Sequence, residues 1–112
     1  MKTYCRIPFE QELWEELDAE ANASGKIILE DNETYVQLMP VDKYAFMPGA
    51  EQMIDIILNF SSQVALGLLI NWLYDKIKQK NIKKFIIKDE TYEVKGKDML
   101  ENVIENNSDK DE

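Results

Sequence analysis

The residue types that most often carry out catalysis are nearly missing from this chain. There is no histidine, and the one cysteine is Cys5. Histidine is the commonest general base and a common metal ligand, so Cys5 lacks the usual activating partner and cannot build a structural zinc site. The four glycines, at positions 25, 49, 67 and 96, stand apart and form no phosphate-binding loop. We therefore expect no enzyme, no metal site and no cofactor.

Carboxylates are the one plentiful group that could perform acid–base or metal chemistry. Glu12 and Glu16 are one helical turn apart, with Glu15 between them, and such a pair could bind a divalent cation. No segment follows the ligand order of a calcium loop, and 112 residues leave little room for a sugar-binding cleft. The cluster Glu12, Glu15, Glu16 and Asp18 is more typical of a solvated helix face, or of an acidic face that binds a basic groove.

A second candidate surface combines aromatic and lysine side chains. Trp72 and Tyr74 precede a stretch, residues 76–88, that holds six lysines and no acid. Lysines near the end of a helix complement its dipole, but tryptophan and tyrosine are also the residues that dominate binding hot spots. We predict a protein-docking corner, whose residues are Trp72, Tyr74, Lys76, Lys80, Lys83 and Lys84.

Composition indicates an ordinary globular domain, with 45 % hydrophobic and 31 % charged residues. The net charge of −9 is concentrated in residues 1–60, which hold 4 basic and 12 acidic side chains. An acidic chain repels phosphate backbones, so we expect no direct nucleic-acid binding. A single cysteine allows no internal disulfide, and no apolar leader follows Met1, so we expect a cytoplasmic location.

Hydrophobic periodicity predicts most elements directly. The predicted elements are a strand at 3–7, a helix at 10–23, a hairpin of 26–29 with 34–38, a loop at 40–49, a hairpin of 84–87 with 92–94, and a helix at 97–106. Residues 50–80 form the strongest helical prediction, because they contain no proline and are apolar on nearly every face between Met53 and Leu73.

Such a helix is either buried at the centre of the domain or spans a membrane. Asp55, Asn59 and Asn71 lie within it, and an aspartate in lipid costs about 2.5–3.5 kcal/mol, so burial is favoured and membrane association is not. A small domain cannot cover every face of this helix, which leaves one for a partner or for a homo-oligomer.

The expected fold is therefore α+β. Two β-hairpins and an N-terminal strand pack with a long central apolar helix and two shorter helices, in the order β-α-β-β-α-β-β-α. Residues 1–106 form a single domain, and residues 107–112 form a disordered acidic tail.

Four stretches carry a family resemblance: Met47-Pro48-Gly49-Ala50-Glu51, Val64-Ala65-Leu66, Asn71-Trp72-Leu73 and Lys84-Phe85-Ile86-Ile87. Together they resemble the effector-associated constant component family, small accessory proteins of bacterial conflict (anti-phage) systems. Members have a small-residue, apolar helix that ends in a Trp-Leu pair, followed by basic residues, a strand, a turn, a strand and a helix. The resemblance implies a non-enzymatic adaptor that joins a sensor or effector of a defence system, with no catalytic residues to transfer.

Three functions remain open from the sequence. The first is an adaptor that binds an effector, sensor or enzyme of a defence system through the central helix and its lysine-rich end. The second is a small inhibitor, such as an immunity protein or a phage-encoded anti-defence protein, whose acidic face blocks a basic groove. The third and weakest is a membrane-associated effector that acts through residues 53–73.

Overall fold

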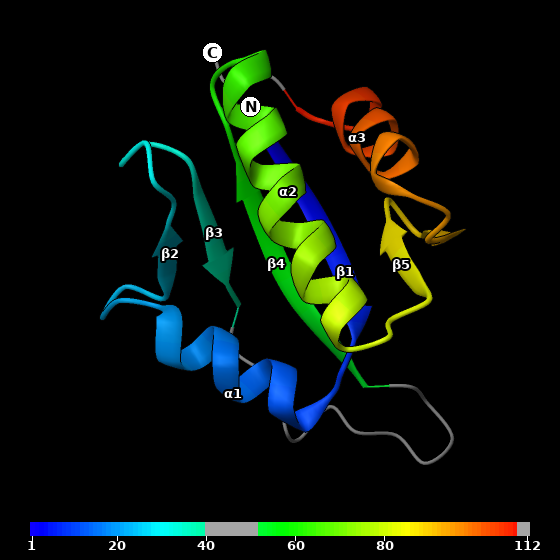
Figure 1. Ribbon diagram of the computed structural model, residues 1–112, viewed down its shortest axis with the longest axis horizontal. Helices are drawn as coiled ribbons and strands as arrows, with labels where there is room; N and C mark the ends of the chain where they lie inside the picture. The colour runs from blue at the N-terminus through cyan, green and yellow to red at the C-terminus, as the bar shows by residue number, and fades with distance from the viewer. Residues whose placement is uncertain (40–51, 110–112) are drawn as a thin grey trace.

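The computed structural model describes residues 1–39 and 52–109, which form an α+β fold of a six-stranded antiparallel sheet and three helices (Figure 1). Its elements are β1 (Lys2–Pro8), α1 (Gln11–Glu20), β2 (Lys26–Ile28), β3 (Tyr35–Leu38), β4 (Met53–Asn59), α2 (Gln63–Gln79), β5 (Lys84–Ile87), β6 (Glu90–Glu93) and α3 (Lys97–Asn106). The α+β class is confirmed, and both predicted hairpins form, the second with its return strand at Glu90–Glu93 and not at 92–94. The predicted loop at 40–49 and the stretch Met47-Pro48-Gly49-Ala50-Glu51 lie outside the described residues.

The strands lie in the order β2-β3-β4-β1-β5-β6, so the two longest strands occupy the centre of the sheet. All seven residues of β1 pair with β4, from Lys2 opposite Asn59 to Pro8 opposite Met53. Strand β3 pairs with the other side of β4, and the β5–β6 hairpin pairs with β1 through Arg6 and Ile86. The centre of the sheet therefore joins the start of the chain to its middle.

The long central helix predicted at 50–80 is wrong in its first half. Residues 53–59 form β4, and the helix begins only at Gln63, after the N-cap Ser62, whose hydroxyl accepts a hydrogen bond from Ala65 N–H at 3.1 Å. Alternate residues of β4 are buried, with Ile54 as the first, because a strand presents successive side chains to opposite faces of the sheet. The observed order is thus β-α-β-β-β-α-β-β-α.

The membrane alternative depended on residues 53–73 being one helix. These residues instead divide between β4 and α2. In the described parts of the chain, the helices are all too short or too polar to cross a membrane.

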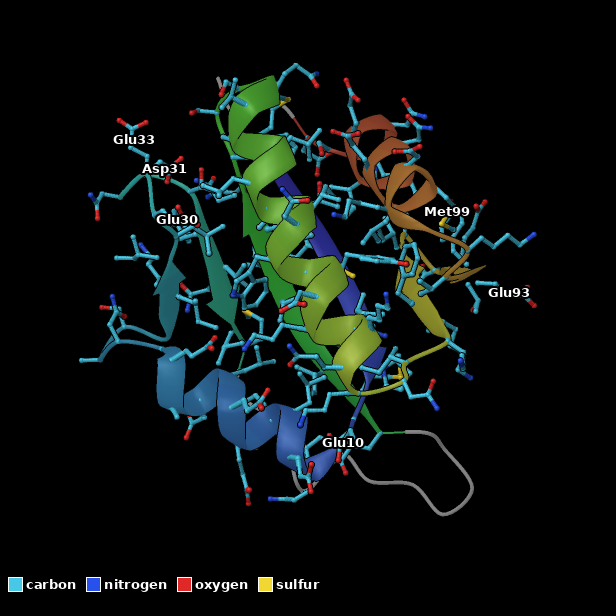
Figure 2. All side chains as sticks on the ribbon, viewed as in Figure 1. Glu10, Glu30, Asp31, Glu33, Glu93 and Met99 are labelled. Carbon is cyan, nitrogen blue, oxygen red and sulfur yellow. The ribbon has the colours of Figure 1, made fainter. Side chains whose placement is uncertain are left out.

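Helix α1 lies across the end of β2 and β3 and is shorter than the predicted helix at 10–23 (Figure 1). It begins after Glu10, whose carboxylate accepts hydrogen bonds from the backbone N–H groups of Glu12 and Leu13 at 3.2 and 2.8 Å (Figure 2). A carboxylate at this position satisfies helix N–H groups that would otherwise lack partners. Leu13 and Leu17 are buried, which confirms the apolar stripe.

The three helices cover one face of the sheet. Helix α2 crosses in front of β4 and β1, and α3 lies beside α2, above the tip of β5 in this view (Figure 1). Buried side chains of every helix and of strands β1 to β5 form one core cluster, with Phe60 and Phe85 as its largest fully buried members. The opposite face, here called the open face, carries the alternate residues of each strand, such as Tyr4, which is 60 % exposed.

The predicted disordered tail is wrong in the part that the structure describes. The backbone N–H and C=O groups of Asp109 bond to those of Lys2 at 2.8 and 3.0 Å. The hydroxyls of Ser108 and Thr3 lie 2.5 Å apart. These bonds hold the end of α3 against β1. Residues 110–112 lie outside the described residues.

The alternating burial of β4 predicts unequal effects of two neighbouring substitutions. Leu58 is fully buried and Ile57 lies on the open face, so Leu58→Ala should lower the free energy of unfolding by about 2–5 kcal/mol and Ile57→Ala by about 1 kcal/mol. Urea denaturation followed by circular dichroism measures both. Equal losses at the two positions would contradict the strand.

Candidate functional site

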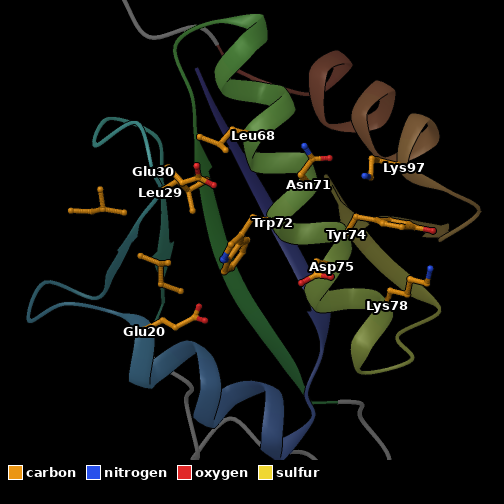
Figure 3. Close-up of a pocket in the computed structure, with 12 residues that line it drawn as sticks. Glu20, Leu29, Glu30, Leu68, Asn71, Trp72, Tyr74, Asp75, Lys78 and Lys97 are labelled. Carbon is orange, nitrogen blue, oxygen red and sulfur yellow. The ribbon is translucent and has the colours of Figure 1, made fainter.

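A groove lies along helix α2 (Figure 3). Residues 27–30, from β2 into its turn, line one side of it, and Lys97 of α3 lies on the other side. The α2 residues that line it are Leu68, Asn71, Trp72, Tyr74, Asp75 and Lys78. Glu20, at the end of α1, closes one end. The cavity volume is about 780 Å³. It exists because α2 covers the central strands and α1 covers only the end of β2 and β3.

Trp72 is the largest side chain in the groove. It is half-buried, and its ring projects from α2 toward β2 and β3 (Figure 3). Lys76 Nζ lies 5.8 Å from the ring centroid, within the range of a cation–π interaction. The neighbouring Leu73 points into the core and is 1 % exposed. In the pair Trp72-Leu73, Leu73 thus anchors the helix in the core, and Trp72 lines the groove.

Tyr74 lines the same cavity as Trp72 but projects from a different side of α2. Two residues further along the helix, its ring projects away from Trp72, toward α3 (Figure 3). Lys97 Nζ of α3 lies 5.7 Å from this ring. Residues two apart on a helix do not face each other.

Lys76 and Lys80, which belong to the predicted docking corner, form ion pairs with helix α1. Lys76 Nζ lies 2.6 Å from Glu20 Oε1 and 3.8 Å from Glu16 Oε2. Lys80 Nζ lies 3.3 Å from Glu12 Oε2 and 3.4 Å from Glu16 Oε1. We call these five residues the ionic clasp. Glu16 is central to it, because its two oxygens lie near different lysines.

The ionic clasp removes charges from both predicted surfaces. Glu12 and Glu16 belong to the predicted acidic face, and Lys76 and Lys80 belong to the predicted docking corner. In the structure these glutamates and lysines form ion pairs with one another, so their charges neutralise each other. Of the acidic face, Glu15 and Asp18 stay exposed and outside the clasp, with Glu15 accepting a hydrogen bond from Gln11 Nε2 at 2.9 Å.

The remaining two lysines of the predicted corner lie beyond the helix. Lys83 is exposed and precedes β5, and its carbonyl accepts a hydrogen bond from Val94 N–H at 2.8 Å. Lys84 is half-buried within β5. The structure therefore divides the predicted corner among the groove, the clasp and the β5 region.

The clasp also changes how Lys80 titrates. Burial against α1 lowers the pKa of Lys80, but the hydrogen bonds and negative charges of Glu12 and Glu16 outweigh it, so the pKa is raised above its ordinary value of 10.5. The charged form of Lys80 is therefore favoured in the folded chain.

Cys5, the one cysteine of the chain, is buried in strand β1. Burial of Cys5, together with the negative charge of Asp55, raises the pKa of its thiol to about 12, so the thiol stays protonated and unreactive near neutral pH. Across residues 1–39 and 52–109, no three acidic or cysteine side chains gather closely enough to hold a metal ion.

Comparison with known proteins returned no matching family model, no matching curated protein and no matching solved structure.

The groove was not predicted as a site, although part of its signal is in the sequence. Leu68, Asn71, Trp72 and Asp75 recur at the spacing of one helix face. The prediction of an all-round apolar helix obscured this, because residues 53–59 were included in the same helix. The contribution of β2 depends on tertiary packing that no local pattern encodes.

The clasp predicts that Glu16 matters more to stability than its neighbour. Glu16→Lys places a third cation beside Lys76 and Lys80 and should lower the thermal midpoint by about 3–6 °C. Glu15→Lys makes the same charge change outside the clasp and serves as the control. Differential scanning calorimetry at low salt and at about 0.5 M NaCl should show the difference shrinking with salt. Equal midpoints for the two variants would contradict the clasp.

The raised pKa of Lys80 predicts a loss of stability at alkaline pH. A group whose pKa is raised by folding stabilises the folded chain below its unfolded pKa, and this stabilisation disappears as the pH rises through the folded pKa. Between about pH 9 and pH 12, the urea midpoint of the wild type should therefore fall more steeply than that of Lys80→Gln. Lys78→Gln, at an exposed position of the same helix, should follow the wild type. Parallel curves for the wild type and Lys80→Gln would contradict this prediction.

Proposed function

We propose that this protein is a non-catalytic protein-binding component, an adaptor that joins a partner to a multiprotein assembly. The observation that supports this most directly is the groove along α2, where a half-buried tryptophan lines a cavity of about 780 Å³. No described segment of the chain fills this cavity. At about 780 Å³, the groove is larger than the hollow of about 270 Å³ that Tyr4 lines.

The chemistry of the groove suits a protein partner. Trp72 and Leu68 provide apolar contact, while Asn71 and Asp75 provide an exposed polar rim on the same helix. A buried aromatic anchor inside a polar rim is the usual arrangement of a binding hot spot. Trp72 is held in place by Lys76, which the ionic clasp fixes in turn, so little side-chain freedom is lost when a partner binds.

The family resemblance supports a setting in bacterial defence. Its Asn71-Trp72-Leu73 stretch lies on α2, and the lysines, two strands and helix that follow correspond to the end of α2 with β5, β6 and α3. On this basis we propose a cytoplasmic adaptor in a conflict (anti-phage) system, with an effector, sensor or enzyme of that system as its partner.

A second candidate function is a small acidic inhibitor. It is favoured by Glu15 and Asp18, which stay exposed on α1 outside the clasp, in a chain of net charge −9. Such a protein would bind a basic groove through α1 rather than engage a partner through Trp72.

The adaptor proposal predicts that blocking the groove abolishes partner capture. Asn71→Arg with Asp75→Arg places two bulky cations on the exposed rim without touching the core. Affinity capture from the native cell, quantified by mass spectrometry, should show a partner retained by the wild type and reduced about tenfold or more by this double variant. Asn102→Arg with Asp98→Arg repeats the same changes on exposed positions of α3 and should retain the partner.

A third variant in the same experiment distinguishes the inhibitor hypothesis from the adaptor hypothesis. Glu15→Lys with Asp18→Lys reverses the acidic face while leaving the clasp intact, which reversal at Glu12 or Glu16 would not do. An adaptor should keep its partner in this variant, and an inhibitor should lose it. Retention of every captured protein by the groove variant would contradict the adaptor proposal.

A further inference from the structure

The open face of the sheet carries two neighbouring rows of side chains set by the strand register. One row runs across β2, β3, β4 and β1, and its members are Ile28, Tyr35, Asn59 and Lys2. The adjacent row starts on the same strands, and its members are Lys26, Gln37, Ile57 and Tyr4. Lys88, which follows β5, lines the same hollow as Tyr4 and extends the second row. We call this surface the lysine–tyrosine patch.

The lysine–tyrosine patch is positive in a strongly acidic protein. Its two rows contain Lys2, Lys26 and Lys88 and no carboxylate, whereas the chain carries a net charge of −9. Three acids lie at its border. Asp55 lies 3.0 Å from Arg6 in the next row, and Asp109 lies 3.7 Å from Lys88. Asp89 follows Lys88 and lines the same hollow as Tyr4. Helix α1, which carries five carboxylates, lies on the other face of the sheet.

The patch also exposes apolar surface. Tyr4, on a central strand, is 60 % exposed, and Ile28, on the edge strand, is 51 % exposed. Ile57 pairs with Tyr4 across the strands and is half-buried. Lys26 Nζ lies 4.5 Å above the ring of Tyr35. Large exposed side chains gathered at the centre of a sheet are typical of an interaction surface.

A hollow beside Tyr4 gives this surface a place for an anchoring side chain. Its cavity volume is about 270 Å³. Met39 and Ile86 line it together with Tyr4, and the Arg6–Asp55 ion pair lies among its walls. One bulky apolar side chain of a partner fits a hollow of this size and polarity.

We propose that the lysine–tyrosine patch is a second binding surface, and that its occupant is an acidic segment of a partner protein. A bulky apolar side chain of that segment enters the hollow beside Tyr4, and neighbouring carboxylates face Lys2, Lys26 and Lys88. Charge complementarity selects this occupant, because the patch is the positive part of a negative molecule. A nucleic-acid strand fits less well, since three lysines offer few phosphate contacts and the net charge of −9 repels a polyanion.

The patch and the groove open on opposite faces of the sheet and share one residue, Ile28 of the edge strand β2. Trp72 lies on the face that the helices cover, and Tyr4 lies on the open face. Two partners anchored at Trp72 and at Tyr4 can therefore bind at once, as an adaptor requires. The patch does not depend on the groove, so each can be tested while the other is intact.

Selection from a displayed library of random short peptides, with the wild-type protein as bait, tests the proposal. We expect enriched peptides that combine several aspartates or glutamates with one bulky apolar residue. Their binding should weaken about tenfold or more in Tyr4→Ala and in the triple variant Lys2→Glu, Lys26→Glu, Lys88→Glu. The triple variant Lys78→Glu, Lys83→Glu, Lys95→Glu makes the same charge change at exposed lysines elsewhere and should bind within about twofold of the wild type.

Amide chemical shifts locate the bound peptide and expose the competing occupants. Perturbations should centre on Tyr4 and Ile57 and leave Trp72 unchanged. Failure to enrich acidic peptides, or perturbations confined to the groove, would overturn the proposal. Tighter binding of oligothymidylate than of the acidic peptides would assign the patch to nucleic acid instead. Self-association of the wild type that Tyr4→Ala abolishes would assign it to a second copy of the chain.

Discussion

The pairing of β1 with β4 is the constraint on which the rest of the structure depends. Seven residues at the start of the chain pair with seven in its middle, and β3 and β5 pair with the two sides of this central ribbon, with β2 and β6 outside them. Forming it closes a loop of more than forty residues, an entropic cost that only burial of its helix-facing side chains offsets. Helix α2 packs over the ribbon, and α1 and α3 fill in beside it. All three helices lie on one face, so the opposite face of the ribbon stays available.

This arrangement brings together charges that the sequence keeps apart. The acids of residues 10–20 and the lysines of residues 76–80 are separated by the whole sheet-forming middle of the chain, yet the clasp pairs them across α1 and α2. A segregated charge pattern in the sequence therefore does not imply two free charged surfaces. On the open face the reverse holds, because Lys2, Lys26 and Lys88 come from distant segments and gather only through strand register.

Much of the fold follows from local pattern, and the failures share one cause. Both hairpins, the first strand and the last helix are set by β-branched runs, turn residues and helical spacing. The prediction for residues 53–59 is wrong because this strand has apolar residues on both faces. Ile54, Ile56 and Leu58 lie on one face and Ile57 on the other, so the sequence is as apolar as that of a buried helix. Asp55 and Asn59 are an even number of positions apart, as expected for polar side chains on the open face of a strand, and Ser62 is a typical helix N-cap residue. These signals are weak beside a continuous apolar run.

For the candidate site, the sequence indicates which residue types are suited to binding, but not which of them lie together. The sequence predicts Trp72 as an interface-type side chain, but which neighbours it contacts depends on the rotation of α2 over the sheet. That rotation sends Leu73 into the core and Tyr74 toward α3, and it leaves Trp72 facing a region of β2 and β3 that no described helix covers. A partner's side chains would complete the layer there. The same argument applies to the open face, which none of the described helices covers. This incomplete two-layer architecture is thus the physical feature on which the proposed binding function rests.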